Sequence, residues 1–307
     1  EASGRRPVSI RTVDQVDLKG KRVFIRVDFN VPLDEKNEIT DDTRILHSLP
    51  TIRFVIEAGG KAILASHLGR PKGKKDPKYS LAPIAERLSQ CLGQKVTLAN
   101  DCIGEEAFAM SASLKPGEVL LLENLRFYKE EEKGDAEFSM KLAKHGDVYV
   151  NDAFGTAHRA HGSTAVIANF MQEKYPGFLM LAELENAQKV LADPARPFTA
   201  IMGGAKVSDK ILIIEKLLDK VDNLLIGGGM AYTFLKAKGY QIGTSLCEND
   251  KVALAAGILK SAREKGVTVL TPIDSVVSDK FGEDGRTAIV RNDAFPEDMM
   301  GLDIGPE

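Results

Sequence analysis

Polar and basic side chains follow four predicted strands in the first half of the chain. They are Asp28 and Asn30 at the end of the run 21–29, His67 and Arg70 at the end of 61–67, Arg126 after 118–123, and His158, Arg159 and His161 after 147–152, with Arg44 opening a predicted helix. Ligands of open α/β sheets bind beyond the carboxyl ends of the strands. Arg presents a planar fork to phosphate and carboxylate oxygens, so a site for a multiply charged anion is predicted. The alternative is a scatter of surface arginines in weak salt bridges.

The second half carries glycines where strands end. Gly203, Gly204, Ala205 and Lys206 follow the strand 199–202, Ser208, Asp209 and Lys210 are expected to open a helix, and Gly227, Gly228 and Gly229 follow the strand 223–226. Glycine permits close backbone approach, and a helix N-terminus offers free N–H groups. These features predict a cradle for nucleotide phosphates. Tight packing of strand against helix is the alternative for the glycine triplet.

Several known signatures are absent. The chain has no G-x-x-x-x-G-K-[ST] segment, and Tyr232 stands where a dinucleotide fingerprint starting at Gly227 needs Gly or Ala. The protein-kinase motifs are missing as well, and without the fingerprint a nicotinamide-dependent dehydrogenase is the weaker interpretation. His158 and His161 form an H-x-x-H pair, but zinc needs three or four ligands, so phosphate binding or loop packing is favoured for them.

Apolar segments alternate with amphipathic ones along the chain. Strands are predicted over 21–29, 61–67, 118–123, 147–152, 199–202, 223–226 and 267–271, and helices over 42–57, 81–92, 136–144, 177–192, 208–218, 230–238 and 249–265. Continuous apolar strands between helices indicate parallel sheets covered on both faces. We therefore predict an α/β fold of two doubly wound, Rossmann-like lobes. The alternative is one continuous sheet.

The domain junction is predicted where the helix 177–192 runs into a proline-rich turn with Pro194 and Pro197. The prediction is an N-terminal domain over 1–176, a hinge helix and linker over 177–197, and a C-terminal domain over 198–307. The net charge of −3 makes nucleic acid an unfavoured partner, and no apolar run is long enough for a bilayer. Three cysteines without paired spacing indicate a reducing, cytoplasmic location, although an organellar form would look the same.

Eight segments resemble phosphoglycerate kinases, in the order of that family: RVDFNVP, ITDDTRI, SHLGRPKG, LLLENLRFYKEEE, VNDAFGTAHRAHGS, GGAKVSDKI, LLIGGGMAYTF and MGLDIGP. The resemblance implies a glycolytic or gluconeogenic kinase that moves a phosphoryl group between 1,3-bisphosphoglycerate and ADP, giving 3-phosphoglycerate and ATP. It also implies a monomer.

Site residues follow from the matching motifs. The resemblance implies that the acid substrate contacts Asp28, Asn30, Arg44, His67, Arg70, Arg126 and Arg159. It implies that the nucleotide contacts Gly203, Gly204, Ala205, Lys206, Lys210, Gly227, Gly228, Leu246, Phe281 and Leu302.

The chain departs from the family in one respect. Family members continue past LDIGP into a segment that carries the carboxylate directed at Mg²⁺, so no metal ligand is assigned here. A truncated, non-catalytic nucleotide- or anion-binding fragment is therefore the alternative function. If the chain is catalytic, its nucleophile is already anionic and needs no general base. Arg44 and Lys206 are expected to neutralise the transferring phosphoryl group, with Mg²⁺, after domain closure.

Overall fold

The computed structural model describes residues 11–192 and 194–307. The first ten residues of the predicted N-terminal domain and Asp193 of the predicted linker lie outside the described residues. The chain divides into two compact units between Ala187 and Gln188, inside helix α6 (Phe178–Ala192). We refer to them as the N-terminal unit and the C-terminal unit.

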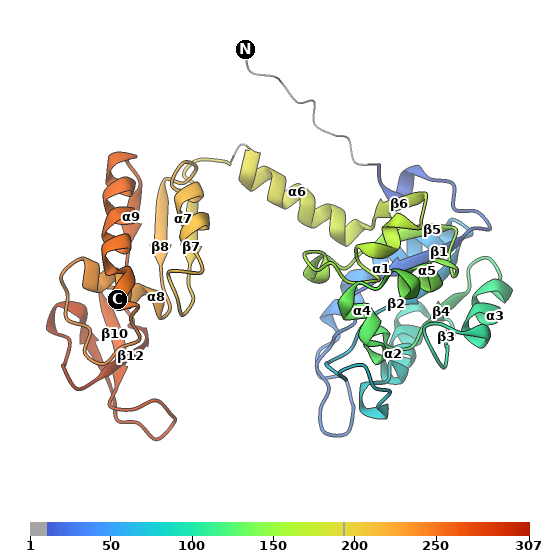
Figure 1. Cartoon of the computed structure of the whole chain (residues 1–307), viewed down its shortest axis with the longest axis horizontal. Helices are drawn as coiled ribbons and strands as arrows, with labels where there is room; N and C mark the ends of the chain where they lie inside the picture. The colour runs from blue at the N-terminus through green and yellow to red at the C-terminus, as the bar shows by residue number, and fades with distance from the viewer. Residues whose placement is uncertain (1–10, 193) are drawn as a thin grey trace, which may run out of the picture. The chain divides into compact units, whose positions relative to one another are not determined.

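The N-terminal unit is built on a parallel sheet in the order β3-β4-β2-β1-β5-β6 (Figure 1). Its strands are β1 (Arg22–Arg26), β2 (Lys61–Ala65), β3 (Val96–Leu98), β4 (Val119–Leu121), β5 (Val148–Asn151) and β6 (Glu173–Pro176). The order changes direction along the sheet, as in other doubly wound folds, and neighbouring carboxyl ends reach one edge.

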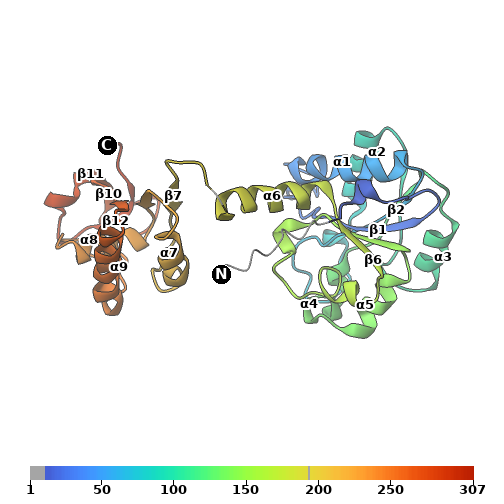
Figure 2. The ribbon, with the colours of Figure 1, turned by 90° about the horizontal axis from the view of Figure 1, so that it is seen from above.

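Helices cover both faces of this sheet (Figure 2). They are α1 (Thr43–Glu57), α2 (Ala82–Leu92), α3 (Glu105–Ser113), α4 (Lys129–Lys133) and α5 (Ala136–Ala143). Val23 and Ile25 of β1 are buried in a core with residues of α1 and α2, whereas Phe24 is buried in a second core with residues of α3 and α5. Successive strand residues point to opposite faces, so the middle of a strand covered on both sides is apolar on both faces, as in Val23, Phe24 and Ile25.

The C-terminal unit contains two three-stranded sheets. The parallel sheet has the order β7-β8-β9, with β7 (Thr199–Met202), β8 (Asn223–Ile226) and β9 (Thr268–Leu270). The antiparallel sheet has the order β11-β10-β12, with β10 (Asp274–Ser278), β11 (Thr287–Arg291) and β12 (Met300–Ile304). Its helices are α7 (Ile211–Leu217), α8 (Met230–Ala237) and α9 (Val252–Glu264).

These three helices pack against one face of the parallel sheet, where Leu224 and Ile226 are buried with them. On the other face, Ile201 is 78% exposed and Leu270 is 51% exposed. The expectation that strands are covered on both faces is therefore met in the N-terminal unit, but on one side only for this sheet within the described residues.

Most predicted elements are present with shifted ends, and the α/β fold class is confirmed. The sequence patterns missed the short strands β3 and β6, the helices α3 and α4, and the antiparallel sheet. Short 3₁₀ helices also occur, at Val13–Gln15, Pro77–Tyr79, Leu125–Phe127, Phe154–Thr156, Val166–Asn169, Asn249–Lys251 and Asn292–Ala294. No helix in the described ranges has both the length and the apolar composition to cross a bilayer.

Candidate active site

A cavity of about 250 Å³ opens at the carboxyl edge of the N-terminal sheet. Its lining combines residues that follow β1, β2, β4 and β5 with one residue of α1: Asp28, Asn30, Arg44, His67, Gly69, Arg70, Arg126, Gly155, Thr156 and Arg159. All seven residues assigned to the acid substrate from the sequence are therefore brought together. We call this cavity the arginine pocket.

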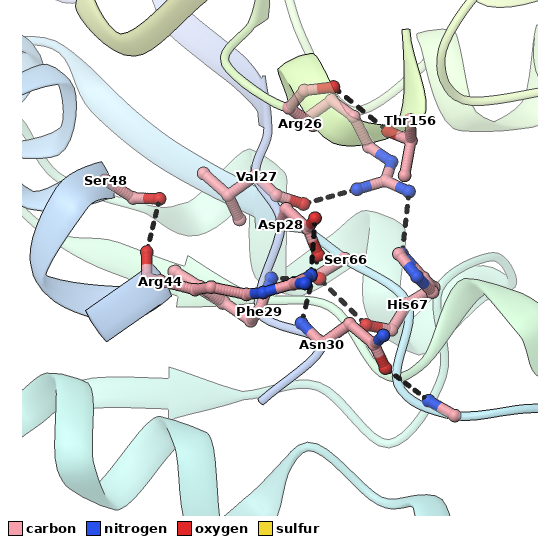
Figure 3. A network of polar contacts seen from close by, with 12 residues as sticks. Arg26, Val27, Asp28, Phe29, Asn30, Arg44, Ser48, Ser66, His67 and Thr156 are labelled. Carbon is pink, nitrogen blue, oxygen red and sulfur yellow. Dashed lines mark hydrogen bonds and ion pairs between the residues drawn. The ribbon is translucent and has the colours of Figure 1, made fainter. Parts of the chain in front are cut away.

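The side chains of Asp28 and Asn30, just after the carboxyl end of β1, are held by hydrogen bonds (Figure 3). Arg44 Nη1 donates to Asp28 Oδ2 at 2.8 Å, which ties the first turn of α1 to the end of β1. The Gly69 N–H donates to Asn30 Oδ1 at 2.8 Å. The amide nitrogen of Asn30, Nδ2, bonds to no other described residue and is therefore a free hydrogen-bond donor.

Arg126 is almost fully buried, with 5% of its side chain exposed. Its Nη1 donates to the Gly69 carbonyl at 2.7 Å, and its Nε lies 3.5 Å from Glu132 Oε1. Burial lowers the pKa of Arg126, but a guanidinium stays protonated at neutral pH. Gly69 itself has φ +60°, and a Cβ there would lie 2.5 Å from the ring of Tyr79. The loop that presents His67 and Arg70 therefore has little freedom.

Arg70 and Arg159 also line the pocket, and neither makes an ion pair or a side-chain hydrogen bond with another described residue. Their guanidinium groups are available for a ligand. His158 is exposed and His161 is half-buried, and neither lines the arginine pocket. Burial, together with Arg126 and Arg159, lowers the pKa of His161.

His67 corrects the sequence-based view that Arg and His side chains alike supply positive charge. The side chain is 4% exposed. Burial, followed by the charges of Arg26, Arg126, Arg159 and Arg44, lowers the pKa of His67 to about 2. The ring is therefore neutral at physiological pH, and the positive charge of the pocket comes from arginine alone.

Three residues in or near this site were not singled out from the sequence. Gly155 and Thr156 line the pocket from the 3₁₀ helix that follows β5. Arg26 is the last residue of β1 and is 1% exposed. Its Nη2 lies 3.1 Å from Nδ1 of the His67 ring (Figure 3). A signal existed for Arg26, because it is a charged residue inside the apolar run KRVFIRVDF.

In the C-terminal unit the two glycine turns pack on each other. Gly227 N–H donates to the Met202 carbonyl and Met230 N–H to the Gly204 carbonyl, both at 2.8 Å. Gly228 has φ +66°, and a Cβ there would lie 2.8 Å from Gly204 N. Close packing therefore requires glycine here, whether or not phosphate also binds. Lys206 and Lys210 make no ion pair among the described residues.

The helix expected to open at Ser208 begins instead at Ile211, after a turn over 208–210. The physical reason is a tight turn, in which Lys210 N donates to the Val207 carbonyl at 2.9 Å. The Glu248 carboxylate accepts hydrogen bonds from Val207 N at 2.6 Å and from Ser208 N at 3.1 Å. These two N–H groups are consequently not free for a phosphate. Lys206, Lys210 and the glycine turns are the remaining phosphate-binding elements.

The residues expected near the base and ribose are only partly brought together. Leu246 lies against Gly229, where an added Cβ would be 3.0 Å from Leu246 Cδ2. Gly227 lines an apolar cavity of about 240 Å³ beside Ile304 at the end of β12. Phe281 and Leu302 do not line that cavity; Phe281 lies between β10 and β11 and is 86% exposed.

No cluster of three or more His, Cys, Asp or Glu side chains suited to a metal ion occurs in the described part of the chain. These residues thus offer no ready resident metal site, and Mg²⁺ is treated below as part of the nucleotide substrate.

Taken together, a doubly wound unit with an arginine-lined pocket and a second α/β unit with glycine turns and free lysines define a phosphate-binding α/β protein. The profile of the family described as phosphoglycerate kinase matches residues 13–307. The chain belongs to the phosphoglycerate kinase family, and the resemblance seen in its motifs is confirmed. It is accordingly a phosphotransferase of glycolysis.

Relatives and solved structures agree with this assignment. The chain is 56% identical to the cytosolic phosphoglycerate kinase of Triticum aestivum over 299 residues, which cover 97% of this chain and 74% of that protein. It is 54% identical to the enzyme of Prosthecochloris aestuarii, covering 97% and 75%. The structure of phosphoglycerate kinase from Coxiella burnetii is similar with a TM-score of 0.83 at 41% identity, covering 97% of this chain and 75% of that one.

Proposed function

We propose that the arginine pocket binds 3-phosphoglycerate or 1,3-bisphosphoglycerate and that the C-terminal unit binds ADP or ATP. The observation that carries the first assignment is charge complementarity. Four arginines and one aspartate line the pocket with a neutral His67, which gives 4 − 1 = +3. The phosphate and carboxylate of 3-phosphoglycerate together carry roughly −2.5 to −3 at pH 7.

Distinct groups are available for the two ends of the acid. Asn30, Arg70 and Arg159 present donors that no other described residue occupies. Arg44 shares its charge with Asp28 across 2.8 Å and is still 51% exposed. It can therefore face the reacting carboxylate end while Asp28 fixes its direction. We assign Arg44 to the transferring phosphoryl group and the other arginines to holding the acid.

The nucleotide assignment rests on Lys206, Lys210 and the packed glycine turns, with Gly203, Gly204, Ala205, Gly227 and Gly228 allowing close backbone approach. Leu246 offers an apolar contact beside them, and Phe281 and Leu302 are proposed to join it when the nucleotide is bound. Mg²⁺ enters with the nucleotide as MgADP or MgATP. Lys206 supplies charge to the transferring group from this side.

The reaction needs no proton transfer. A β-phosphate oxygen of ADP forms a bond to the phosphorus of the acyl phosphate, the bond between that phosphorus and the carboxylate oxygen breaks, and the carboxylate leaves as an anion. The residues therefore align the reactants and neutralise charge on the phosphoryl oxygens. We propose that the segment 177–197 acts as the hinge through which the bound substrates reach in-line geometry while water is excluded.

A coupled assay of ATP consumption with 3-phosphoglycerate tests this function. We expect Arg44→Ala and Lys206→Ala each to lower kcat by roughly 10²–10³, the usual effect of losing one oriented donor to developing charge. Lys260→Ala is the matched control, because Lys260 is 79% exposed on α9. A rise in KM alone would reject the catalytic assignment of that residue. Binding of both ligands without turnover would favour the non-catalytic fragment.

We further propose that the chain acts as a monomer in a reducing compartment. Its relatives include cytosolic proteins of Triticum aestivum and Arabidopsis thaliana and a chloroplastic protein of Arabidopsis thaliana. The free cysteines Cys91, Cys102 and Cys247 are compatible with such a compartment. We propose the cytoplasm as its location, and fractionation of cells would test this.

A further inference from the structure

A buried polar network lies directly behind the arginine pocket. Arg26 Nε donates to Ser163 Oγ at 2.7 Å, and Ser163 Oγ donates in turn to Glu131 Oε1 at 2.5 Å. The Ser163 N–H donates to Glu131 Oε2 at 2.8 Å. Arg26 and Glu131 are each 1% exposed. Neither belongs to the pocket lining, so the network does not itself touch a ligand there.

The remaining contacts of Arg26 connect this network to the pocket. One terminal nitrogen, Nη1, donates to the Val27 carbonyl, and the other, Nη2, lies 3.1 Å from His67 Nδ1 (Figure 3). A guanidinium has five N–H donors and no acceptor. The contact with His67 can therefore form a hydrogen bond only if Nδ1 of the ring is unprotonated and accepts.

This requirement determines where the proton of the imidazole is. A neutral imidazole carries one proton, so an unprotonated Nδ1 places it on Nε2. Nε2 of His67 makes no hydrogen bond with another described residue, and it is not among the side-chain atoms shut off from solvent. Because His67 lines the arginine pocket, its Nε2–H is free to donate to a ligand there.

We propose that Arg26 is a positioning residue that holds His67 in the Nε2–H tautomer, so that the arginine pocket presents a neutral hydrogen-bond donor to an oxygen of the acid substrate. The proposal rests on the assignment of that pocket to the acid. Glu131 and Ser163 serve to hold Arg26. A carboxylate within the same buried network offsets its charge, and the serine hydroxyl fixes the direction of Nε.

A neutral donor has a specific advantage in this place. Four guanidinium groups already line the pocket, and a fifth cation would raise the repulsion among them in the free protein. The Nε2–H group adds a directional contact without adding charge. It also stays the same from mildly acidic to alkaline pH, since Arg26 does not titrate in that range.

The first test is nitrogen NMR of the protein with ¹⁵N-labelled histidine, in which the two neutral tautomers and the imidazolium give different shift patterns. His67 is assigned as the signal missing from His67→Gln. We expect the Nε2–H pattern from pH 5.5 to 8, with or without 3-phosphoglycerate. The Nδ1–H tautomer or an imidazolium in the free protein would overturn the proposal. This readout does not depend on activity, so it stands even if the acid binds elsewhere.

The second test removes Arg26 without leaving a buried charge, through the double variant Arg26→Met with Glu131→Gln. We expect the His67 signal to become a mixture of the two tautomers and the KM for 3-phosphoglycerate to rise in inverse proportion to the remaining Nε2–H fraction, about twofold for an equal mixture. The KM for the nucleotide should not change. His145, buried in the same unit, is the internal control for folding and should keep its signals. An unchanged His67 signal would contradict the role of Arg26.

A third test compares two variants of His67 and leaves Arg26, Ser163 and Glu131 unchanged. Gln in place of His67 can put an amide near the position of Nε2, whereas Asn is too short and reaches only the position of Nδ1. We expect His67→Gln to retain affinity for 3-phosphoglycerate within a few-fold and His67→Asn to lose about tenfold or more. Equal losses, or a smaller loss for His67→Asn, would show that the donor is not at Nε2.

Discussion

Replacement of Arg126 by methionine examines the arginine pocket most directly. Methionine keeps an unbranched stem that ends near the position of Nε, in a site where 5% of the arginine side chain is exposed, and it removes the charge and the donors. In the protein the Arg126 guanidinium gives one hydrogen bond to the Gly69 carbonyl at 2.7 Å. Its other nitrogens are left to the ligand and to the more distant Glu132.

Two effects of different size are expected. A hydrogen bond to a charged group contributes about 1.5–3 kcal/mol, which corresponds to a loss of roughly 10- to 150-fold in affinity for 3-phosphoglycerate. The Gly69 carbonyl loses its donor, which should lower the free energy of unfolding by about 1 kcal/mol. The loss in binding should therefore exceed the loss in stability.

Calorimetric titration with 3-phosphoglycerate measures the first effect, and the KM for the acid should follow it while the KM for the nucleotide changes little. Arg22→Met is the matched control. Arg22 begins β1 at the opposite edge of the sheet and pairs with Asp147 at 2.7 Å, with 28% of its side chain exposed. Such pairs contribute about 0–1 kcal/mol.

The reasoning would be refuted if the Arg126→Met variant bound the acid as tightly as the original protein. It would equally fail if Arg22→Met lost as much affinity, because the effect would then come from total charge and not from a contact in the pocket.

Two further predictions concern the same unit. His145 is fully buried, and burial is the chief reason that its pKa is lowered to about 4. In the unfolded chain this histidine takes up a proton near pH 6.5, whereas in the folded chain it does not. The free energy of unfolding should therefore fall by up to about 3 kcal/mol through this residue as the pH falls from 6.5 to 4. Urea titrations should show a shallower pH dependence for His145→Asn, and an identical slope would exclude His145 as the source. Gly69→Ala should raise the KM for 3-phosphoglycerate and destabilise the unit more than Gly93→Ala, because both glycines have positive φ but only Gly69 abuts Tyr79; equal effects in activity and thermal unfolding assays would show that contact with the ring is unimportant.

The composition of the pocket could be predicted because it depends on local order along the chain. In a parallel sheet the carboxyl ends of neighbouring strands share one edge, so residues such as Asn30, Arg70 and Arg126 must come near one another once the strands are recognised. The central strands are recognisable because both faces of the sheet are covered, so most of their residues are apolar. The lobes and the pocket thus follow from patterns a few residues long.

What could not be predicted depends on contacts between distant residues. Glu248, 40 positions or more away in the sequence, accepts hydrogen bonds from the N–H groups of Val207 and Ser208, so these groups are not free for a phosphate. His67 is neutral because it is buried among arginines, and neither burial nor that proximity is visible in its own sequence neighbourhood. The antiparallel strands β10 to β12 were missed because they alternate exposed and buried residues only weakly.

The arginine pocket also shows how several like charges can be kept together before a ligand arrives. Unpaired guanidinium groups at close range would repel one another and lose hydration. Here the most buried ones have protein partners: Arg126 bonds to the Gly69 carbonyl, and Arg26 is joined to Glu131 through Ser163. Arg70 and Arg159 have none among the described side chains. The unpaired positive charge therefore lies on Arg70 and Arg159, where an anion can reach it. The buried arginines beneath them are held by protein partners. Because these partners belong to the fold and not to the ligand, binding would require little rearrangement. Replacement of Arg70 or Arg159 should therefore lower the affinity for the acid more than it lowers the stability of the unit.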